Sequence, residues 1–170
     1  SQAKGKPFFI NLWIHEPHTP FHVDPKLQKR FSKLEEKDAI YAATLFHADL
    51  RIGQLLDALD RLNLTKDTLV IFSSDNGPAR GAPDAPLTLG YDSATGLGYG
   101  IAAAKGITGD RRAYKGALLE GGIGVPFIAR WPGKVPAGKV DKTSILSAVD
   151  LLPTFCELAG VKLPRSYKPD

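Results

Sequence analysis

The chain has 170 residues, with 22 Lys and Arg against 18 Asp and Glu, and 43% of its residues are hydrophobic. This length fits one domain or a large part of one, and the apolar fraction is enough to build a core. The slight basic excess is scattered, so no basic stripe of the kind that binds nucleic acid is visible, although it suits an anionic substrate. The single cysteine, Cys156, excludes an internal disulfide, and no stretch is long enough to predict a membrane span.

The chain begins with an apolar run that leads into a histidine-rich loop. Residues 8–14 are almost continuously apolar, which predicts a central strand covered on both faces. Residues 15–22 contain three histidines and two prolines, and the prolines exclude a helix. A zinc site is the weaker interpretation, because without a helix His18 and His22 do not share a face. The alternative is that one histidine does acid–base work while His15 and His22 are exposed loop residues.

A long helix and a short strand follow. Apolar residues recur at three- and four-residue steps over residues 35–63, which predicts one amphipathic helix. The β-branched and aromatic run at residues 68–72 predicts a buried strand that ends in a tight turn. With residues 8–14 these elements form one predicted βαβ unit. His47 and Asp49, in the middle of the helix, are interpreted as structural.

Two polar residues lie just past this strand, at Asp75 and Asn76. Parallel strands of an α/β sheet present ligand-binding groups beyond their carboxyl ends, and carboxylate and amide oxygens suit Ca²⁺ or Mg²⁺. The alternative is an ordinary Asx-type turn, since Asp, Asn and Gly are common turn residues. Considered without the rest of the chain, these residues favour the turn.

The second half is predicted to contain a long loop, two short strands and a closing helix. Residues 79–112 are rich in Gly, Pro and Ala with little periodicity, which predicts a functional or mobile loop. Residues 125–131 and 143–147 are predicted strands, and Asp150 is a predicted N-cap of a helix that ends at Gly160.

A cationic group precedes the first of these strands. Lys115 follows two arginines in the sequence, and two adjacent glycines, Gly121 and Gly122, allow close approach of the backbone. The charges on their own favour a solvated basic loop over an anion site.

Together, these motifs closely resemble the type I sulfatases of the alkaline phosphatase superfamily, in their order and spacing. The likeness covers nearly the whole chain apart from the insertion after Pro78. The matching segments are residues 7–9, 16–20, 68–77, 115–116, 120–123, 125–126, 131–133 and 149–154, together with the helix that contains Asp49 and Gly53. The resemblance implies an α/β fold with a mostly parallel sheet, helices on both faces and site residues at strand ends.

The resemblance also implies roles for four residues. Asp75 and Asn76 would be ligands of a divalent cation, usually Ca²⁺, with Mg²⁺ possible. His18 would contact the sulfate ester and donate a proton to the leaving oxygen, and Lys115 would bind the sulfate oxygens. The implied partner is a sulfated small molecule or glycan, not nucleic acid. The family implies a periplasmic, extracellular or lysosome-like location, and the oligomeric state stays open.

Part of the family's catalytic machinery has no counterpart in these residues. The family's nucleophile is a formylglycine made within a Cys-x-Pro/Ala-x-Arg pattern, and Cys156 does not fit that pattern. The 170 residues are therefore expected to form the C-terminal portion of a catalytic domain, inactive alone. Many relatives also have Arg where this chain has Gly124. A phosphodiesterase or phosphonate hydrolase of the same superfamily, or a non-catalytic binding module, are the alternatives.

Overall fold

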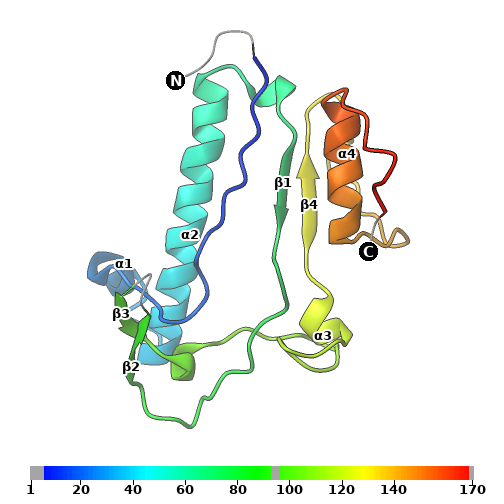
Figure 1. The fold of residues 1–170 in the computed structure, drawn as a ribbon. Helices are drawn as coiled ribbons and strands as arrows, with labels where there is room; N and C mark the ends of the chain where they lie inside the picture. The colour runs from blue at the N-terminus through cyan, green and yellow to red at the C-terminus, as the bar shows by residue number, and fades with distance from the viewer. Residues whose placement is uncertain (1–5, 93–95, 169–170) are drawn as a thin grey trace. The chain divides into compact units, whose positions relative to one another are not determined.

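The computed structural model describes residues 6–92 and 96–168, and the chain divides into two units, residues 1–135 and 136–170. The helices are α1 (Pro25–Arg30), α2 (Glu36–Arg61), α3 (Glu120–Ile123) and α4 (Leu151–Leu158), and the strands are β1 (Val70–Ser73), β2 (Leu89–Asp92), β3 (Gly96–Tyr99) and β4 (Phe127–Arg130) (Figure 1). In the described part of the chain, no helix has the length and apolar character needed to cross a membrane.

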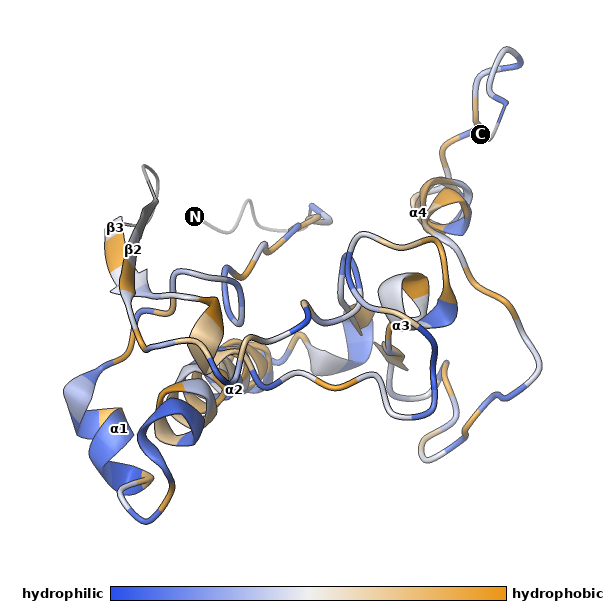
Figure 2. Ribbon diagram, turned by 90° about the horizontal axis from the view of Figure 1, so that it is seen from below, coloured by the Kyte–Doolittle hydropathy of each residue, from blue (hydrophilic) through white to orange (hydrophobic). Residues whose placement is uncertain are grey.

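The helix α2 is the main support of the first unit and confirms the predicted long helix. Short helix α1 and the 3-10 turn at Ile101–Ala103 pack against it. The core cluster consists of Phe21, Ile40, Ala103 and Ala104, of which Phe21, Ile40 and Ala103 are fully buried. Helix α1 contributes no buried residue and is largely hydrophilic (Figure 2). The core therefore combines two large side chains with two alanines at the 3-10 turn, whose small size lets the turn approach α2 closely.

Two antiparallel strand pairs make up the sheet structure of the described residues. β1 pairs with β4, with Val70 opposite Arg130 and Ser73 opposite Phe127. β2 pairs with β3 as a hairpin. Both strands predicted on either side of the long insertion are thus confirmed, at residues 70–73 and 127–130. The expected mostly parallel sheet is not confirmed by these pairings.

The predicted strand at residues 8–14 is wrong for this structure, and so is the βαβ unit that it would complete. Residues 6–15 have no regular secondary structure, and Phe9 and Trp13 are 69% and 87% exposed. A continuous apolar run forms a central strand only where other elements cover both of its faces. Within the described residues these side chains remain largely exposed.

The long segment at residues 79–112 is not a structureless loop. It contains the hairpin β2–β3. The sequence did not reveal this hairpin, because its strands are rich in glycine and too short to show a clear period of apolar residues. Lys37, on α2, donates from Nζ to the carbonyl oxygens of Pro83 and Ala85 at 2.6 and 2.7 Å. Lys105 pairs with Asp38 at 2.7 Å. The insertion is therefore fastened to the first turns of α2 on both sides of the hairpin.

The second unit contains α4, which confirms the predicted closing helix. Asp150 occupies the predicted N-cap position of α4, but its side chain makes no capping hydrogen bond to this helix. Its carboxylate instead accepts from the backbone N–H of Ser147 at 2.8 Å and so closes the preceding 3-10 turn.

The predicted strand at residues 143–147 is also wrong, because a carboxylate accepts hydrogen bonds from backbone N–H groups there. Asp141 accepts hydrogen bonds from the backbone N–H groups of Thr143 and Ser144 at 2.8 and 2.9 Å. Bonds from the backbone of Ser144 and then of Thr143, with those from their hydroxyls, hold the pKa of Asp141 below its ordinary value. N–H groups used in this way are not free for a β-ladder.

The chain that follows β1 is held against α3 by a contact that requires glycine. The N–H of Gly77 donates to the carbonyl oxygen of Gly122 at 2.8 Å, and the N–H of Lys115 donates to that of Pro78 at 2.9 Å. A Cβ at Gly77 would lie only 2.0 Å from the carbonyl oxygen of Gly121. The two segments approach as bare backbones, and this approach fixes the residues around Asp75.

We expect Gly77→Ala to destabilise the protein, because the added Cβ meets backbone rather than a movable side chain. Overpacking of this kind costs about 1–3 kcal/mol. The matched control is Gly53→Ala in α2, where a Cβ meets nothing within 4 Å. That change should stabilise the helix by about 0.5–1 kcal/mol. Urea unfolding midpoints measure both, and a Gly77→Ala variant as stable as wild type would contradict the contact.

Candidate active site

The loop after β1 presents two oxygen atoms that its own hydrogen bonds do not use. The backbone N–H of Asn76 donates to Oδ1 of Asp75 at 2.9 Å, and Nδ2 of Asn76 donates to the carbonyl oxygen of Gly77 at 2.8 Å. Ser74 donates from Oγ to the carbonyl oxygen of Asn76 at 2.9 Å. Among the described residues no hydrogen bond uses Oδ2 of Asp75 or Oδ1 of Asn76. The chain bends at Asp75 and Asn76, and the internal bonds of this loop leave both predicted ligand atoms available.

These two oxygens fit a hard cation, but only as part of a ligand set. Ca²⁺ takes about 6–8 oxygen ligands, and Mg²⁺ needs near-octahedral coordination. Within residues 6–92 and 96–168, no group of three or more His, Cys, Asp or Glu side chains could hold a metal ion.

Lys115 lies next to this loop through its backbone, and its side chain is exposed. In the described structure its ammonium group has no acidic partner, so its charge is not neutralised within the chain. Arg111, in the same basic group, donates from Nη1 to the carbonyl oxygen of Gly124 at 2.8 Å. The basic group is therefore divided between a structural guanidinium and a Lys115 side chain that is free to meet an anion.

His18 is exposed, and its ring is oriented by its neighbour. Nδ1 of His18 lies 2.6 Å from the carbonyl oxygen of Thr19. A carbonyl oxygen only accepts, so Nδ1 carries the hydrogen in this bond and Nε2 faces away from it. The ring of His15 lies 5.9 Å from the rings of both His18 and His22. His18 thus presents one ring nitrogen for proton transfer.

The expected exposure of His15 and His22 is wrong, because both side chains are half-buried. Nε2 of His22 is buried and lacks a hydrogen-bond partner among the described residues. The sequence suggested exposure because the loop is polar and rich in proline. Packing of the loop onto the hairpin, which the sequence did not predict, accounts for the difference.

Of the four predicted site residues, only Asp75 and Asn76 are in direct contact, through the bond from the N–H of Asn76 to Oδ1 of Asp75. Lys115 contacts the loop that follows them through its backbone bond to Pro78. No contact in the described part of the chain joins His18 directly to the other three.

Both loops are nevertheless anchored on the segment that follows β3. Phe21 forms a two-way backbone bridge with Tyr99, at 2.8 and 3.0 Å, which ties the histidine loop to β3. On the other side, a Cβ at Gly106 would lie 2.5 Å from Cβ of Pro78. The segment from Tyr99 to Gly106 is therefore the physical connection between the two halves of the site.

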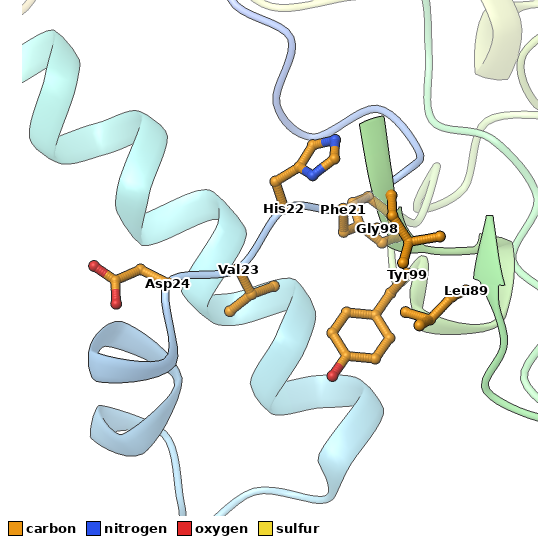
Figure 3. A pocket seen from close by; sticks show the side chains of 8 residues that line it. Phe21, His22, Val23, Asp24, Leu89, Gly98 and Tyr99 are labelled. Atoms are coloured by element: carbon orange, nitrogen blue, oxygen red, sulfur yellow. The ribbon is translucent and has the colours of Figure 1, made fainter. Parts of the chain in front are cut away.

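A shallow pocket lies beside the histidine loop and was not predicted from the sequence. Figure 3 shows the side chains that line it. Its volume is about 360 Å³. The lining residues are Phe21, His22, Val23, Asp24, Leu89, Leu97, Gly98 and Tyr99. Its walls come from the segment before α1 and from the hairpin β2–β3. None of the four predicted site residues lines it, so it is a neighbour of His18 along the chain rather than the predicted site itself.

Comparison with known proteins identifies the family. A family model described as Sulfatase matches residues 1–161. Arylsulfatase G of Mus musculus is 32% identical over 170 residues, covering 100% of this chain and 29% of the relative. Arylsulfatase A of Homo sapiens is 30% identical over 165 residues, covering 97% of this chain and 27% of the relative.

A solved structure agrees with this match. The crystal structure of Ps i-CgsB in complex with k-i-k-neocarrahexaose superposes with a TM-score of 0.70 at 31% identity. The superposition covers 91% of this chain and 30% of that one. The chain thus spans less than a third of the length of these relatives. Sequence, fold and spacing agree, and the chain belongs to the sulfatase family.

Proposed function

We propose that this chain is the C-terminal portion of a sulfatase catalytic domain, in a protein that hydrolyses sulfate esters of aryl or carbohydrate alcohols. The observation that supports the proposal is the pair of backbone contacts, Gly77 to Gly122 and Lys115 to Pro78, which joins the segment that carries Asp75 and Asn76 to the segment that carries Lys115. Oxygen ligands for a metal ion and a cationic side chain on adjoining segments would suit the transfer of an anionic group. No observation favours a phosphodiesterase or a binding module.

Asp75 and Asn76 are proposed to hold Ca²⁺, or Mg²⁺, through the two oxygens that the loop leaves unused. When bound, such a cation supplies positive charge beside the oxygens of the transferring group. The remaining ligands are proposed to come from outside these 170 residues. So is the nucleophile, a formylglycine, since the chain contains no Cys-x-Pro/Ala-x-Arg pattern.

His18 and Lys115 are proposed to act on the two ends of the bond that breaks. An unactivated alcohol is a poor leaving group, so a proton given to its oxygen would assist its departure. Since Nδ1 of His18 keeps its hydrogen on the carbonyl oxygen of Thr19, His18 would give this proton from Nε2 as the imidazolium, and would be left as the neutral ring. Lys115 would bind the sulfate oxygens and stabilise the negative charge that develops on them.

The hairpin and its pocket are proposed to select the organic part of the substrate. The pocket next to His22 is walled by β2 and β3, which belong to the insertion at residues 79–112. The relatives include arylsulfatases and a protein solved with an oligosaccharide, so both aryl and glycan sulfates are proposed substrates. The mostly parallel sheet and a periplasmic, extracellular or lysosome-like location also remain part of this proposal.

The metal assignment predicts that Asp75→Ala, made in the full-length protein, weakens Ca²⁺ binding and activity together. Changes outside the ligand shell commonly cost about 10–100-fold in affinity, and loss of a direct ligand should cost more. Asp57→Ala, an exposed carboxylate on α2, is the matched control. Calorimetric titration of Ca²⁺ measures the effect. Unchanged affinity in Asp75→Ala would remove Asp75 from the site.

The general-acid assignment predicts a leaving-group dependence in His18→Ala. General acid catalysis is worth about 10²–10⁴-fold, and the loss should be largest where the alcohol is least acidic. We expect kcat to fall steeply for an alkyl or sugar sulfate and much less for 4-nitrophenyl sulfate. Steady-state kinetics on the two substrates measure the ratio. Equal losses on both would assign His18 to binding instead.

The incomplete ligand and nucleophile sets predict that the 170 residues alone do not turn over. We expect no release of 4-nitrophenol from its sulfate ester by the isolated chain. The full-length protein, assayed in parallel on the sulfate and phosphate esters, should release it preferentially from the sulfate. Turnover by the isolated chain would overturn the proposed division of the site, and preference for phosphate would overturn the proposed reaction.

A further inference from the structure

A hydrogen-bonded chain of three side chains links α2 to the loop that carries His18. Nδ1 of His47 lies 3.0 Å from Oε1 of Glu16, two residues before His18 in the sequence. Nε of Arg51 donates to Nε2 of His47 at 3.2 Å. The interpretation of His47 as a structural helix residue, drawn from its position in the sequence, missed this link to the site.

The donor and acceptor properties of Arg51, His47 and Glu16 fix which ring nitrogen of His47 carries the hydrogen. A guanidinium has only donors, so Nε2 of His47 must accept from Arg51 and carries no hydrogen. The hydrogen of the neutral imidazole is therefore on Nδ1, where it donates to the carboxylate of Glu16. Both ring nitrogens are thus used, and the ring is fixed in tautomer and in orientation.

This series of hydrogen bonds is anchored on α2 and leads from the helix to the histidine loop. His47 and Arg51 are four residues apart and share one face of α2. Nη1 of Arg51 also donates to Oε1 of Gln54 at 3.0 Å, which holds the guanidinium against the helix. The side chains of His47 and Glu16 are 31% and 20% exposed, so water competes only partly for their bond.

A displacement of Glu16 would be transmitted to the ring of His18. Only Pro17 separates them, and its ring restricts the backbone at that point. The N–H of His18 donates to the carbonyl oxygen of His15 at 2.9 Å, and its Nδ1 is bonded to Thr19. The loop from His15 to Thr19 is therefore closed on itself and would move with Glu16 as one piece.

We propose that His47 is a positioning residue, which fixes the location of His18 through Glu16 and is itself held by Arg51. The proposal rests on the proposed function of His18 as proton donor. His47 contacts neither the substrate nor the reacting atoms. Its contribution is geometric, and small misplacements of a catalytic group, of about 1 Å, can cost on the order of 10²-fold in rate.

The test compares His47→Ala and His47→Gln with the control Asp57→Ala in the full-length protein. We expect His47→Ala to lower kcat on an alkyl sulfate by about 10–100-fold, with KM for the same substrate little changed. His47→Gln, which retains a donor and an acceptor, should recover part of the loss. The unfolding midpoint and Ca²⁺ affinity should match those of Asp57→Ala. Loss of Ca²⁺ affinity in both His47 variants would show a general structural effect and overturn the proposal.

A double variant separates positioning from stability. Because His47 is proposed to act only through His18, adding His47→Ala to His18→Ala should lower kcat no further. A further, additive loss would overturn the proposal. If the wild-type protein hydrolyses no sulfate ester, the proposed function fails. Hydrogen exchange then still tests whether His47 holds the histidine loop in place. Exchange at residues 15–22 should be faster in His47→Ala than in wild type, and unchanged exchange would overturn the proposed link.

Discussion

The approach of two bare backbones, at Gly77 and Gly121–Gly122, is the constraint on which the proposed site depends. A side chain at Gly77 would meet a carbonyl oxygen at 2.0 Å, so the contact exists only because no Cβ intervenes. It places the turn that carries Asp75 beside the segment that carries Lys115, although 40 positions separate them in the sequence. The position of one segment against the other is therefore set by backbone contacts.

Helix α2 supplies a second constraint, because it anchors the insertion and the histidine loop of the first unit. Lys37 holds the insertion near its start, Asp38 pairs with Lys105 near its end, and His47 holds Glu16 of the histidine loop. These bonds come from polar side chains on a helix whose buried face is mostly alanine and isoleucine. Buried residues fix α2 in the core. His47 follows Ile40 by seven residues, so it lies along the same stripe of the helix and links that fixed position to the histidine loop.

The sequence predicted the elements whose signals are local and missed those that depend on distant partners. The 3.6-residue period of α2 and the β-branched run of β1 needed no other part of the chain to be recognised. The apolar run at residues 8–14 carried an equally strong signal, but a central strand requires covered faces. The hairpin β2–β3 was missed for the opposite reason. Its glycine-rich strands carry almost no strand signal in the sequence and form by pairing with each other. The same holds for His47, whose partner Glu16 lies 31 positions away in the sequence.

The exposure of the proposed site residues indicates what these 170 residues can contribute to a reaction. Asp75, Lys115 and His18 are all exposed, and charges in water interact weakly. Electrostatic stabilisation of a developing negative charge becomes large only where water is excluded and the charges are fixed beforehand. In the proposed site, the glycine contact and the Glu16–His47 bond would serve the second condition, because they fix the loops that carry Asp75 and His18. The first condition is not met by the described residues, so their proposed contribution is orientation rather than desolvation.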